Sequence, residues 1–441
     1  MSFSRYAAYK DSGVEWLGAI PAHWDVRRAK RLCEIRKRIA GILGHDVLSI
    51  TQDGVKIKDL DSNDGQLSLD YSKYQLVEVG DFAMNHMDLL TGYVDISPVA
   101  GVTSPDYRVF ALRDRSVCCD RYLLRVFQMG YRQRIFYAYG QGSSLFGRWR
   151  MPTEQFNDLP IPMPPVDEQV VVAGFLDRET AKIDALVAEQ ERLIELLKEK
   201  RQAVISHAVT KGLNPAAPMK QSGVRGIGLI PESWEVKRLR HVTPRLAGRL
   251  IVQPHQYFSD SGVPILFGNN IGRGDLHLED LKFISHEADR EFAACRVAAG
   301  DLLTIRVGDP GATVVVPAEL NGCHFASAML IRQSLSFDSQ WLCHVMNSDV
   351  VGGQVDAVNY GAAQKQFNVG DAANFLLPVP PIGEQIALRE GLDQIVGSFD
   401  ALAAEARRAV DVLQERRSAL ISAAVTGQID VRGVVSESSA A

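Results

Sequence analysis

Amide, hydroxyl and guanidinium side chains occur in two polar, turn-like stretches within each half of the chain. Arginine can bind guanine, and asparagine or glutamine can bind adenine, through paired hydrogen bonds in the major groove of DNA. Hydroxyl and basic side chains also suit phosphate oxygens, and neighbouring glycines let a backbone approach closely. The candidate residues are Thr51, Gln52, Gln141, Ser143, Ser144, Arg148 and Arg150 in the first half, and Asn269, Asn270, Arg273, Gln364, Lys365 and Gln366 in the second. The competing interpretation is that each is a turn residue bonded to its own backbone.

Motifs for catalysis, nucleotide binding and metal binding are absent from the sequence. There is no GxxxxGK[ST] loop, no Asn-Pro-Pro-aromatic tetrapeptide and no HExxH, and the two-glycine fragments at Gly226 and Gly272 are too short to indicate a dinucleotide site. The six cysteines form no CxxC or Cys/His set at zinc spacing. We expect no catalytic residue, no metal, and free thiols in a reduced, cytoplasmic setting. An enzyme with an unrecognised active site is the alternative.

The overall charge is unusual for a chain with such side chains. The 441 residues carry a net charge of −5, whereas a DNA-binding surface is normally basic. Basic residues nevertheless cluster from Arg27 to Arg38 and at Arg113, Arg115, Arg121, Arg125, Arg132, Arg134, Arg148 and Arg150. Such runs fit either phosphate contacts or a solvated helix face. No apolar run is long enough to span a membrane and no secretory signal opens the chain, so we expect two or three globular domains.

A long internal repeat organises the chain. The segment SGVEWLGAIPAHWDVRRAKRL at Ser12 returns as SGVRGIGLIPESWEVKRLRHV at Ser222, a shift of 210 residues (from 12 to 222). PPVDEQ at Pro164 returns as PPIGEQ at Pro380, a shift of 216 (from 164 to 380) that holds without a gap through the segment beginning at Arg201. Each half is therefore one variable module followed by one module of fixed length.

The variable modules, residues 41–162 and 252–378, contain short apolar or alternating runs broken by Gly, Asp, Asn and Pro, which predicts mixed α/β domains. Each ends at a proline-rich stop, LPIPMPP or LLPVPP. We expect the repeated tryptophans of the opening segments to be core anchors rather than stacking platforms. We expect the Glu-Gln pairs after Pro-Pro to lie at helix N-termini rather than in a catalytic site. These residues are Trp24, Trp234, Glu168, Gln169, Glu384 and Gln385.

Two long helices are predicted after the prolines. From Glu168 to Val209 there is no proline, and apolar residues recur at three- and four-residue spacing with polar breaks at Gln190 and Lys200. The predicted helix-pairing residues are Leu176, Ile183, Leu186, Leu193, Leu197 and Val204, and, with breaks at Ala406 and Arg416, Leu392, Phe399, Leu402, Ala409, Leu413 and Leu420. Two rods of ~60 Å can bury these stripes against each other, antiparallel, with the domains at opposite ends. The alternative is that each helix lies on its own domain.

These observations predict an α+β fold, in which two similar mixed α/β domains are joined by two long helices packed as an antiparallel coiled coil with internal pseudo-two-fold symmetry. The expected boundaries are residues 1–165 and 213–380 for the domains and 166–212 and 381–428 for the helices. Residues 429–441 are expected to form a disordered tail.

Over nearly its whole length, the chain resembles the specificity subunits of type I restriction-modification systems. The resemblance rests on the G-x-IPxxW-x-V-x-R segments at Gly18 and Gly228, the PPxxEQ segments at Pro164 and Pro380, and the helical ends KRQAVISHAVTKGL and ERRSALISAAVTGQI. Each motif is weak alone, but all three occur in order and twice. The first opening segment has HWDV where the second has SWEV.

The resemblance implies two target-recognition domains that each read half of a bipartite DNA site, and paired helices that act as a rigid spacer and a dock. Half-sites read from one face of B-DNA lie about one turn, ~34 Å, apart, so a flexible spacer would blur the gap. The implied partners are two modification (methyltransferase) subunits and restriction (motor and nuclease) subunits. Those subunits would carry S-adenosylmethionine, ATP and Mg²⁺, and this chain would bind no cofactor. The alternative is a coiled-coil scaffold whose domains bind protein rather than DNA.

Overall fold

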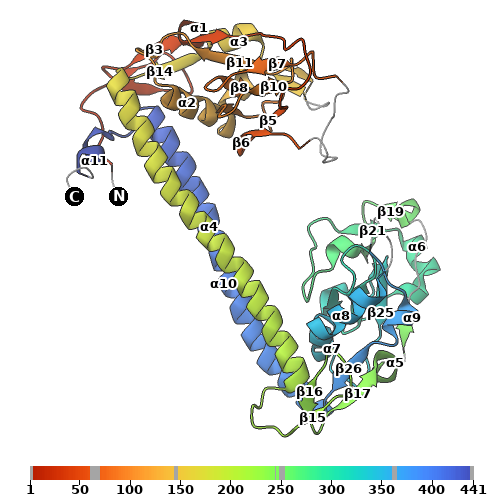
Figure 1. Cartoon of the computed structure of the whole chain (residues 1–441). Coiled ribbons are helices and arrows are strands. Elements are labelled where there is room, and N and C mark those ends of the chain that lie inside the picture. The colour runs from red at the N-terminus through yellow and green to blue at the C-terminus, as the bar shows by residue number, and fades with distance from the viewer. Residues whose placement is uncertain are drawn as a thin grey trace. The chain divides into compact units, whose positions relative to one another are not determined.

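The computed structural model describes residues 3–59, 70–143, 148–243, 245–247, 254–359 and 365–437. The chain forms two compact units, Met1–Gln190 with Arg408–Ala441, and Glu191–Arg407. Each unit combines one mixed α/β domain with part of both long helices, α4 (Val166–Lys211) and α10 (Ile382–Val425) (Figure 1). The predicted α+β fold is confirmed. No helix in the described part of the chain combines the length and apolar character that a membrane span requires.

In the first unit, the opening and exit segments of the domain pair with each other. β1 (Tyr9–Asp11) pairs antiparallel with β2 (Ala19–Pro21), and β3 (Asp25–Arg28) pairs antiparallel with β14 (Pro160–Met163). The chain therefore enters and leaves the domain along adjacent strands. Trp24, between β2 and β3, is fully buried, as is its repeat Trp234, which confirms both as core anchors.

The body of the first domain is a four-stranded sheet in the order β4-β11-β8-β9. Its strands are β4 (Cys33–Ile35), β8 (Phe82–Met84), β9 (Val94–Ile96) and β11 (Arg108–Leu112). Three strand pairs flank it: β5 (Leu48–Thr51) with β6 (Gly54–Ile57), β7 (Gln75–Val77) with β10 (Gly101–Thr103), and β12 (Gln141–Ser143) with β13 (Arg148–Arg150). The helices are α1 (Ala29–Leu32), α2 (Asp120–Arg132), the 3-10 helix η1 (Ile135–Tyr139) and α3 (Thr153–Asp158).

The second domain repeats this plan. β15 (Met219–Gln221) pairs with β16 (Leu229–Pro231), and β17 (Glu235–Arg238) pairs with β26 (Leu376–Val379). Its sheet, β18-β25-β22-β23, orders its strands along the chain as the first sheet does; the bounds are β18 (Leu246–Ala247), β22 (Leu302–Ile305), β23 (Thr313–Val315) and β25 (Ala328–Ile331). A second sheet contains β19 (Phe258–Ser259), β20 (Val263–Leu266), β21 (Lys282–Ile284) and β24 (His324–Phe325). The helices are α5 (Leu239–Val242), η3 (Pro254–Tyr257), η4 (Gly268–Asn270), α6 (His286–Glu291), η5 (Ala293–Cys295), η6 (Ala318–Leu320), α7 (Ser339–Met346), α8 (Asp349–Val358) and α9 (Val369–Ala372).

The two long helices begin directly after Pro165 and Pro381 and end before Gly212 and Gly427. Proline is favoured just before the first turn of a helix, and both glycines adopt a φ of +74°, a left-handed conformation that commonly ends helices. Within each unit the helices pack antiparallel, and their ends join the core of the adjacent domain. The predicted helix boundaries therefore lie within a few residues of the observed ones.

Buried and half-buried side chains define the seam, the face along which α4 and α10 pack. On α4 the seam comprises Leu176, Thr180, Ile183, Val187, Gln190, Ile194, Leu197, Arg201, Val204 and Ala208. On α10 it comprises Leu392, Val396, Phe399, Ala403, Ala406, Val410, Leu413, Arg417, Leu420 and Ala424. The spacing alternates between three and four residues, as expected for a coiled coil. Every position on one helix is related to one on the other by the shift of 216.

Four of the predicted pairing residues, Leu186, Leu193, Leu402 and Ala409, lie beside the seam rather than in it. Leu186, Leu193 and Leu402 are exposed by 46%, 42% and 51%, and the seam instead passes one residue further along the chain. Ala409, the equivalent of Leu193, is half-buried but also lies beside the seam. The seam consists of two rows of residues on each helix, and exposed apolar residues form a third apolar stripe beside it. Because this stripe also has three- and four-residue spacing, the sequence pattern did not distinguish it from the seam.

The predicted disordered tail is also corrected for the described residues. The N–H of Asp430 donates to the carbonyl of Ser4 at 2.8 Å, and Val431 is fully buried in the core of the first domain. A short helix, α11 (Arg432–Glu437), follows. The chain end was polar enough to suggest disorder, but Val431 and Ile429 supply the apolar contacts that hold it.

Candidate nucleic-acid interface

In the first domain, backbone hydrogen bonds bring two polar loops together. The N–H of Met151 donates to the carbonyl of His86 at 3.0 Å, and the N–H of Leu89 donates to the carbonyl of Trp149 at 3.0 Å. Residues 149–151, at the end of the predicted stretch, therefore pack against the loop that follows β8. That second loop was not among the predicted candidates, because its sequence, NHMDLLTG, lacks the glycine-flanked polar pattern of the others.

Equivalent bonds form in the second domain. The N–H of Phe367 donates to the carbonyl of Arg306 at 3.2 Å, and the N–H of Gly308 donates to the carbonyl of Lys365 at 3.3 Å. Gln366 forms an isolated strand bridge with Val307 and is half-buried, whereas Lys365 is exposed. The predicted stretch at residues 365–367 is thus bonded to the loop after β22 in the same way as residues 149–151 are bonded to the loop after β8. Gln364 lies outside the described residues.

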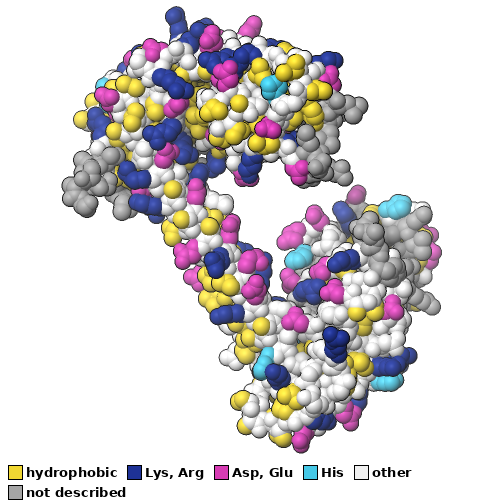
Figure 2. All heavy atoms as spheres, viewed as in Figure 1, with side chains coloured by type: hydrophobic (Ala, Val, Ile, Leu, Met, Phe, Trp, Pro, Cys, Tyr) yellow, Lys and Arg dark blue, Asp and Glu magenta, His cyan; other side chains and the backbone are white. Residues whose placement is uncertain are grey.

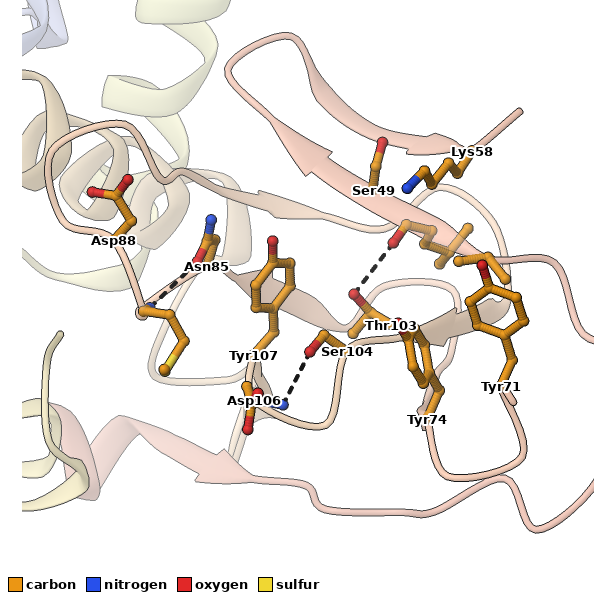
Figure 3. A pocket seen from close by; sticks show the side chains of 13 residues that line it. Ser49, Lys58, Tyr71, Tyr74, Asn85, Asp88, Thr103, Ser104, Asp106 and Tyr107 are labelled. Carbon is orange, nitrogen blue, oxygen red and sulfur yellow. Dashed lines mark hydrogen bonds between the residues drawn. The ribbon is translucent and has the colours of Figure 1, made fainter. Parts of the chain in front are cut away.

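The loops of the first domain enclose a polar hollow of about 490 Å³, here called the first outer hollow. Figure 3 shows Asn85 and Tyr107 pointing into the space beside the strand that carries Ser49. Asn85 Oδ1 accepts from the N–H of Met87 at 3.3 Å, which leaves its amide nitrogen without an acceptor among the described residues. The lining also includes Lys58, Tyr71, Tyr74, Asp88, Thr103, Ser104 and Asp106.

A second outer hollow of about 420 Å³ occupies the equivalent place in the second domain. The turn after β20 and the loop after β22 line it, as the segment at β5 and the loop after β8 line the first. Asn269, Asp309 and Ser327 supply its polar side chains, and Asn269 is exposed. The two domains therefore present the same pair of loops around a hollow but different side chains within it.

Asn270 corrects one predicted contact. It is 2% exposed, its Oδ1 accepts from the N–H of Phe267 at 3.0 Å, and its Nδ2 donates to the carbonyl of His277 at 2.8 Å. Both ends of the amide are occupied by the backbone of its own loop. Asn270 therefore shapes the turn that presents Asn269 and does not face a ligand.

Each unit also contains an inner hollow, where its domain meets its part of the helix pair. The first, of about 630 Å³, is lined by the predicted Gln52 and by Arg417 of α10. The second, of about 190 Å³, is lined by the predicted Arg273 and by Arg201 of α4. Gln52 is exposed, and Arg273 pairs with Asp309 at 2.9 Å. In each unit, a seam arginine thus lies beneath the turn that bears a predicted base-reading residue.

The remaining predicted residues of the first half occupy turn or hairpin positions. Thr51 follows the competing interpretation, because its hydroxyl donates to the carbonyl of Gly54 and accepts from the N–H of Asp53. Gln141 and Arg150 face each other across β12 and β13, and both are exposed. Ser143 and Arg148 pair in the same hairpin, and Ser144 lies outside the described residues. Base or phosphate contact by these residues stays a prediction.

Several arginines that were candidates for phosphate contact serve the fold instead. Arg121 and Arg125 both bind Asp177 of α4, at 2.9 and 2.7 Å. Arg113 donates to the carbonyls of Lys30 and Cys33. Basic side chains spread over the first domain together with acidic ones (Figure 2). A basic run in the sequence therefore marks both internal ion pairs and open surface.

Aromatic residues beside the β12–β13 hairpin were missed. The rings of Tyr137 and Trp149 stack at 5.1 Å, and Trp149 Nε1 donates to the carbonyl of Tyr137 at 2.8 Å. Tyr137 is 37% exposed. The signal was the interleaving of aromatic and basic residues in GRWR, a pattern of nucleic-acid binding surfaces.

A buried cation supports this hairpin. Arg108 is 3% exposed and donates from Nη2 to the carbonyl of Met151 at 3.1 Å, while its Nη1 has no partner in the described part of the chain. Burial lowers the pKa of Arg108 to about 10. Burial, reinforced by the charge of Arg108, lowers the pKa of His86 to about 3. His86 is therefore neutral at physiological pH.

The repeated Glu-Gln pairs lie at the starts of α4 and α10, where their glutamines bind other segments of the chain. Gln169 Oε1 accepts from the N–H of Cys119, and Gln385 Oε1 accepts from the N–H of Asp338. Each amide also donates to the carbonyl of the proline five residues earlier. They tie the start of each long helix to the start of α2 or α7.

The described residues contain no group of three His, Cys, Asp or Glu side chains that could hold a metal ion. The six cysteines form no disulfide, and all except the half-buried Cys119 are buried. Burial raises the pKa of the thiols of Cys118, Cys323 and Cys343 to about 12. These thiols are unreactive core residues.

Known proteins give a consistent comparison, although no family model matches the chain. The type I restriction enzyme EcoBI specificity subunit of Escherichia coli is 25% identical over 336 residues, 72% of this chain and 69% of that protein. The MjaVIII specificity subunit of Methanocaldococcus jannaschii is 24% identical over 289 residues, 63% of this chain and 64% of that protein. A chain in a solved structure of the type I R-M system superposes with a TM-score of 0.66 at 16% identity, covering 92% of this chain and 98% of that one. The fold is therefore shared with that chain.

Proposed function

We infer that the chain belongs to the specificity subunits of type I restriction-modification systems and recognises a bipartite DNA sequence, one half with each domain. The observation that carries this proposal is the doubled site. The loop after β8 and the loop after β22 are held by equivalent backbone bonds and line equivalent outer hollows. Two copies of one reader with different side chains suit two different half-sites.

The side chains at the hollows suit base edges. Gln52, Asn85 and Asn269 offer amides, which recognise adenine by paired hydrogen bonds. Arg150 and Lys365 are exposed on the adjoining segments, where they suit phosphates. This division reconciles a net charge of −5 with DNA binding, because only a few local cations need to meet the backbone.

Catalysis belongs to the partner subunits in this proposal. The chain supplies no metal site within its described residues, and His86 and Arg108, whose pKa values burial lowers, belong to the buried support of the hairpin. S-adenosylmethionine, ATP and Mg²⁺ would be bound by modification and restriction subunits. The chain would position those subunits on DNA and carry out no bond-making step.

The third apolar stripe of the helices is the proposed dock for two copies of the modification subunit. Leu186, Leu193 and Leu196 of α4 are exposed by 42% to 46%, and Leu402 and Val412, the α10 equivalents of Leu186 and Leu196, are exposed by 51% and 62%. Apolar side chains are visible along the helices in Figure 2. Because the exposed positions repeat with the same shift, one partner surface fits both units, which favours two copies.

The DNA-binding proposal is tested with the chain in complex with its partners. Methylation mapping in the source cell, with and without the gene, identifies the target, and binding to target and random duplexes is then measured against salt. We expect a strong preference for the target and a steep salt dependence. Gln52→Ala should weaken one half-site and Asn269→Ala the other, each roughly tenfold, whereas the exposed Gln221→Ala should change neither. Equal binding to all sequences would support the protein-binding scaffold instead.

The dock is tested by counting bound modification subunits. Leu186→Glu with Val412→Glu alters the stripe in the first unit, and Leu196→Glu with Leu402→Glu alters it in the second. Each pair should reduce the number of bound copies from two to one, measured by native mass spectrometry. Leu335→Glu, on a fully exposed leucine of the second domain, is the control. Two copies retained by all variants would exclude this stripe as the dock.

A further inference from the structure

Two ion pairs cross the seam between the long helices. In the first unit, Arg417 of α10 donates from Nε to Asp184 Oδ1 at 2.7 Å and from Nη2 to Oδ2 at 3.2 Å. In the second unit, Arg201 of α4 donates from Nε to Asp400 Oδ1 at 3.0 Å. Each pair joins one helix to the other, unlike the pairs Lys182–Glu179 and Lys198–Glu195, which lie within a single turn of α4.

The two crossing pairs are copies of each other. The shift of 216 that relates the halves carries Asp184 to Asp400 and Arg201 to Arg417. Both arginines occupy positions of a mostly apolar seam, and the side chains of Arg201 and Arg417 are only 23% and 15% exposed. Antiparallel pairing in this register brings each arginine to a carboxylate of the other helix.

A displaced register would separate both pairs. Sliding one helix by a single heptad moves the partners ~10 Å apart, beyond any hydrogen bond. The apolar seam discriminates poorly between registers, because Leu, Ile, Val and Ala recur along both helices and can replace one another. In a displaced register, each half-buried guanidinium would lose its carboxylate partner, and an unpaired charge at such a site costs free energy. Polar seam residues specify the register of a coiled coil in this way.

The same arginines face the domains. Arg417 lines the first inner hollow with the turn Gln52–Gly54, and Arg201 lines the second with Arg273 and Gly274. A Cβ on Gly274 would lie 3.8 Å from Arg201 Nη2, so this turn approaches the ion pair closely. In each unit, one arginine therefore both bridges the two helices and lies beside a turn that carries a predicted base-reading residue.

We propose that Arg417–Asp184 and Arg201–Asp400 are positioning pairs that fix the register of α4 against α10 and thereby the number of unread base pairs between the half-sites. The proposal rests on the proposed function, since a gap exists only for a bipartite target. A base pair rises ~3.4 Å and a heptad of a helix ~10 Å, so a slip of one heptad matches about three base pairs.

The test measures gap preference with the full complex. Duplexes carry the two mapped half-sites with gaps that range from about three base pairs shorter to about three longer than the natural gap, the span of a one-heptad slip in either direction. The unaltered chain should prefer one gap, whereas Asp184→Asn with Asp400→Asn should reduce that preference roughly tenfold while each half-site stays required. The matched control is Glu179→Gln with Glu195→Gln, which removes the same charge without crossing the seam and should leave the preference unchanged.

Two further variants separate positioning from general instability. Exchanging the partners in both pairs, Asp184→Arg with Arg417→Asp and Asp400→Arg with Arg201→Asp, should restore the preference. Arg201→Lys with Arg417→Lys keeps the charge but loses the planar fork, and it should loosen the preference even if the asparagine variant fails to fold. An unchanged gap preference in a folded asparagine or lysine variant would overturn the proposal. Loss of all target preference in the unaltered chain would refute the proposed function instead.

Discussion

The two domains share the contacts that build them and differ in the side chains that they present. Gln169 and Gln385 make the same two kinds of bond at the starts of the long helices, and both sheets order their strands alike. At the loops the match ends: a hairpin with the exposed Arg150 stands in the first domain, where Gln366 and Lys365 stand in the second. A fixed frame with exchangeable loops lets two halves of one chain recognise unlike sequences.

The match also ends at several buried sites, which shows that the halves have diverged within their frame. Arg125 binds Asp177 in the first unit, and at the same place His344 binds Asp393 in the second. In the first sheet, Met84 of β8 pairs with the buried Arg108 of β11, whereas in the second sheet Thr304 of β22 pairs with Met329 of β25. Equivalent positions therefore offer matched pairs of variants, in which one domain is the control for the other.

The largest expected effect comes from replacing residues 41–162 with the same segment of another family member. Because the opening strands β1, β2 and β3 and both long helices stay in place, the frame should persist and only the first half-site should change. Binding to the original target should fall by roughly a hundredfold or more, since each mismatched base pair costs about 1–3 kcal/mol. Methylation mapping checks the result, and a change in both half-sites would contradict the division between domains.

Glu168→Ala should destabilise the first unit far more than Glu384→Ala destabilises the second. Glu168 is 6% exposed and accepts from Tyr6, His23 and Trp24 at 2.6–3.0 Å, whereas Trp234 Nε1 has no partner in the described residues. Leaving buried donors unsatisfied costs about 1–3 kcal/mol each, so we expect a loss of about 2–4 kcal/mol. Hydrogen exchange of residues 9–28 and 219–238 measures both effects, and equal losses would refute the asymmetry.

Gly427→Ala should cost more than Gly212→Ala, although both glycines have a φ of +74°. The left-handed conformation penalises either alanine by about 1 kcal/mol. A Cβ on Gly427 would also lie 2.3 Å from Cδ of Pro21, whereas the nearest atom to a Cβ on Gly212 lies 3.6 Å away, on Trp234. We expect about 1–2 kcal/mol of extra cost at Gly427. Urea unfolding of both variants gives the comparison, and similar midpoints would contradict it.

The smallest expected effect is a pH dependence specific to the second unit. Burial lowers the pKa of His344 below its ordinary value of 6.5, so the folded chain binds this proton less readily than the unfolded chain does. Its contribution to stability is therefore present above pH 6.5 and is lost as the pH falls towards the folded pKa. His344→Gln should flatten this part of the unfolding curve, while the dependence due to His86 remains. Identical pH profiles would exclude the effect.

The sequence predicted the frame because the frame is repeated. The repeated tryptophan, the PPxxEQ segment and the helical ends each occur twice. Together they predicted the two domains, the two long helices and the antiparallel pairing of those helices. Leu186 and Leu193 were misplaced because an apolar stripe beside the seam has the same spacing, and only contacts distinguish a packed stripe from an exposed one. Gln190 does lie in the seam, but the second polar position is Arg201 rather than Lys200.

The candidate site was less predictable. Asn269 and Gln52 lie at hollows as their turn-like sequences suggested, but Asn270, one residue away, turns inward. The loop after β8 joins the site through backbone hydrogen bonds to Met151 and Trp149. Such bonds can form with almost any side chain, so the sequence does not reveal them. Periodicity identifies faces of regular elements, whereas the direction of a loop side chain depends on contacts between segments far apart in the chain.

The division of the chain into units has a consequence for its synthesis. The second unit is one continuous segment, Glu191–Arg407, whereas the core of the first domain also includes Ile421, Ala424, Val425 and Val431. Domains usually complete their folding in the order in which the ribosome releases them. Here the core of the first domain is complete only after residues 421–431 have been translated, so the second domain can complete its core first.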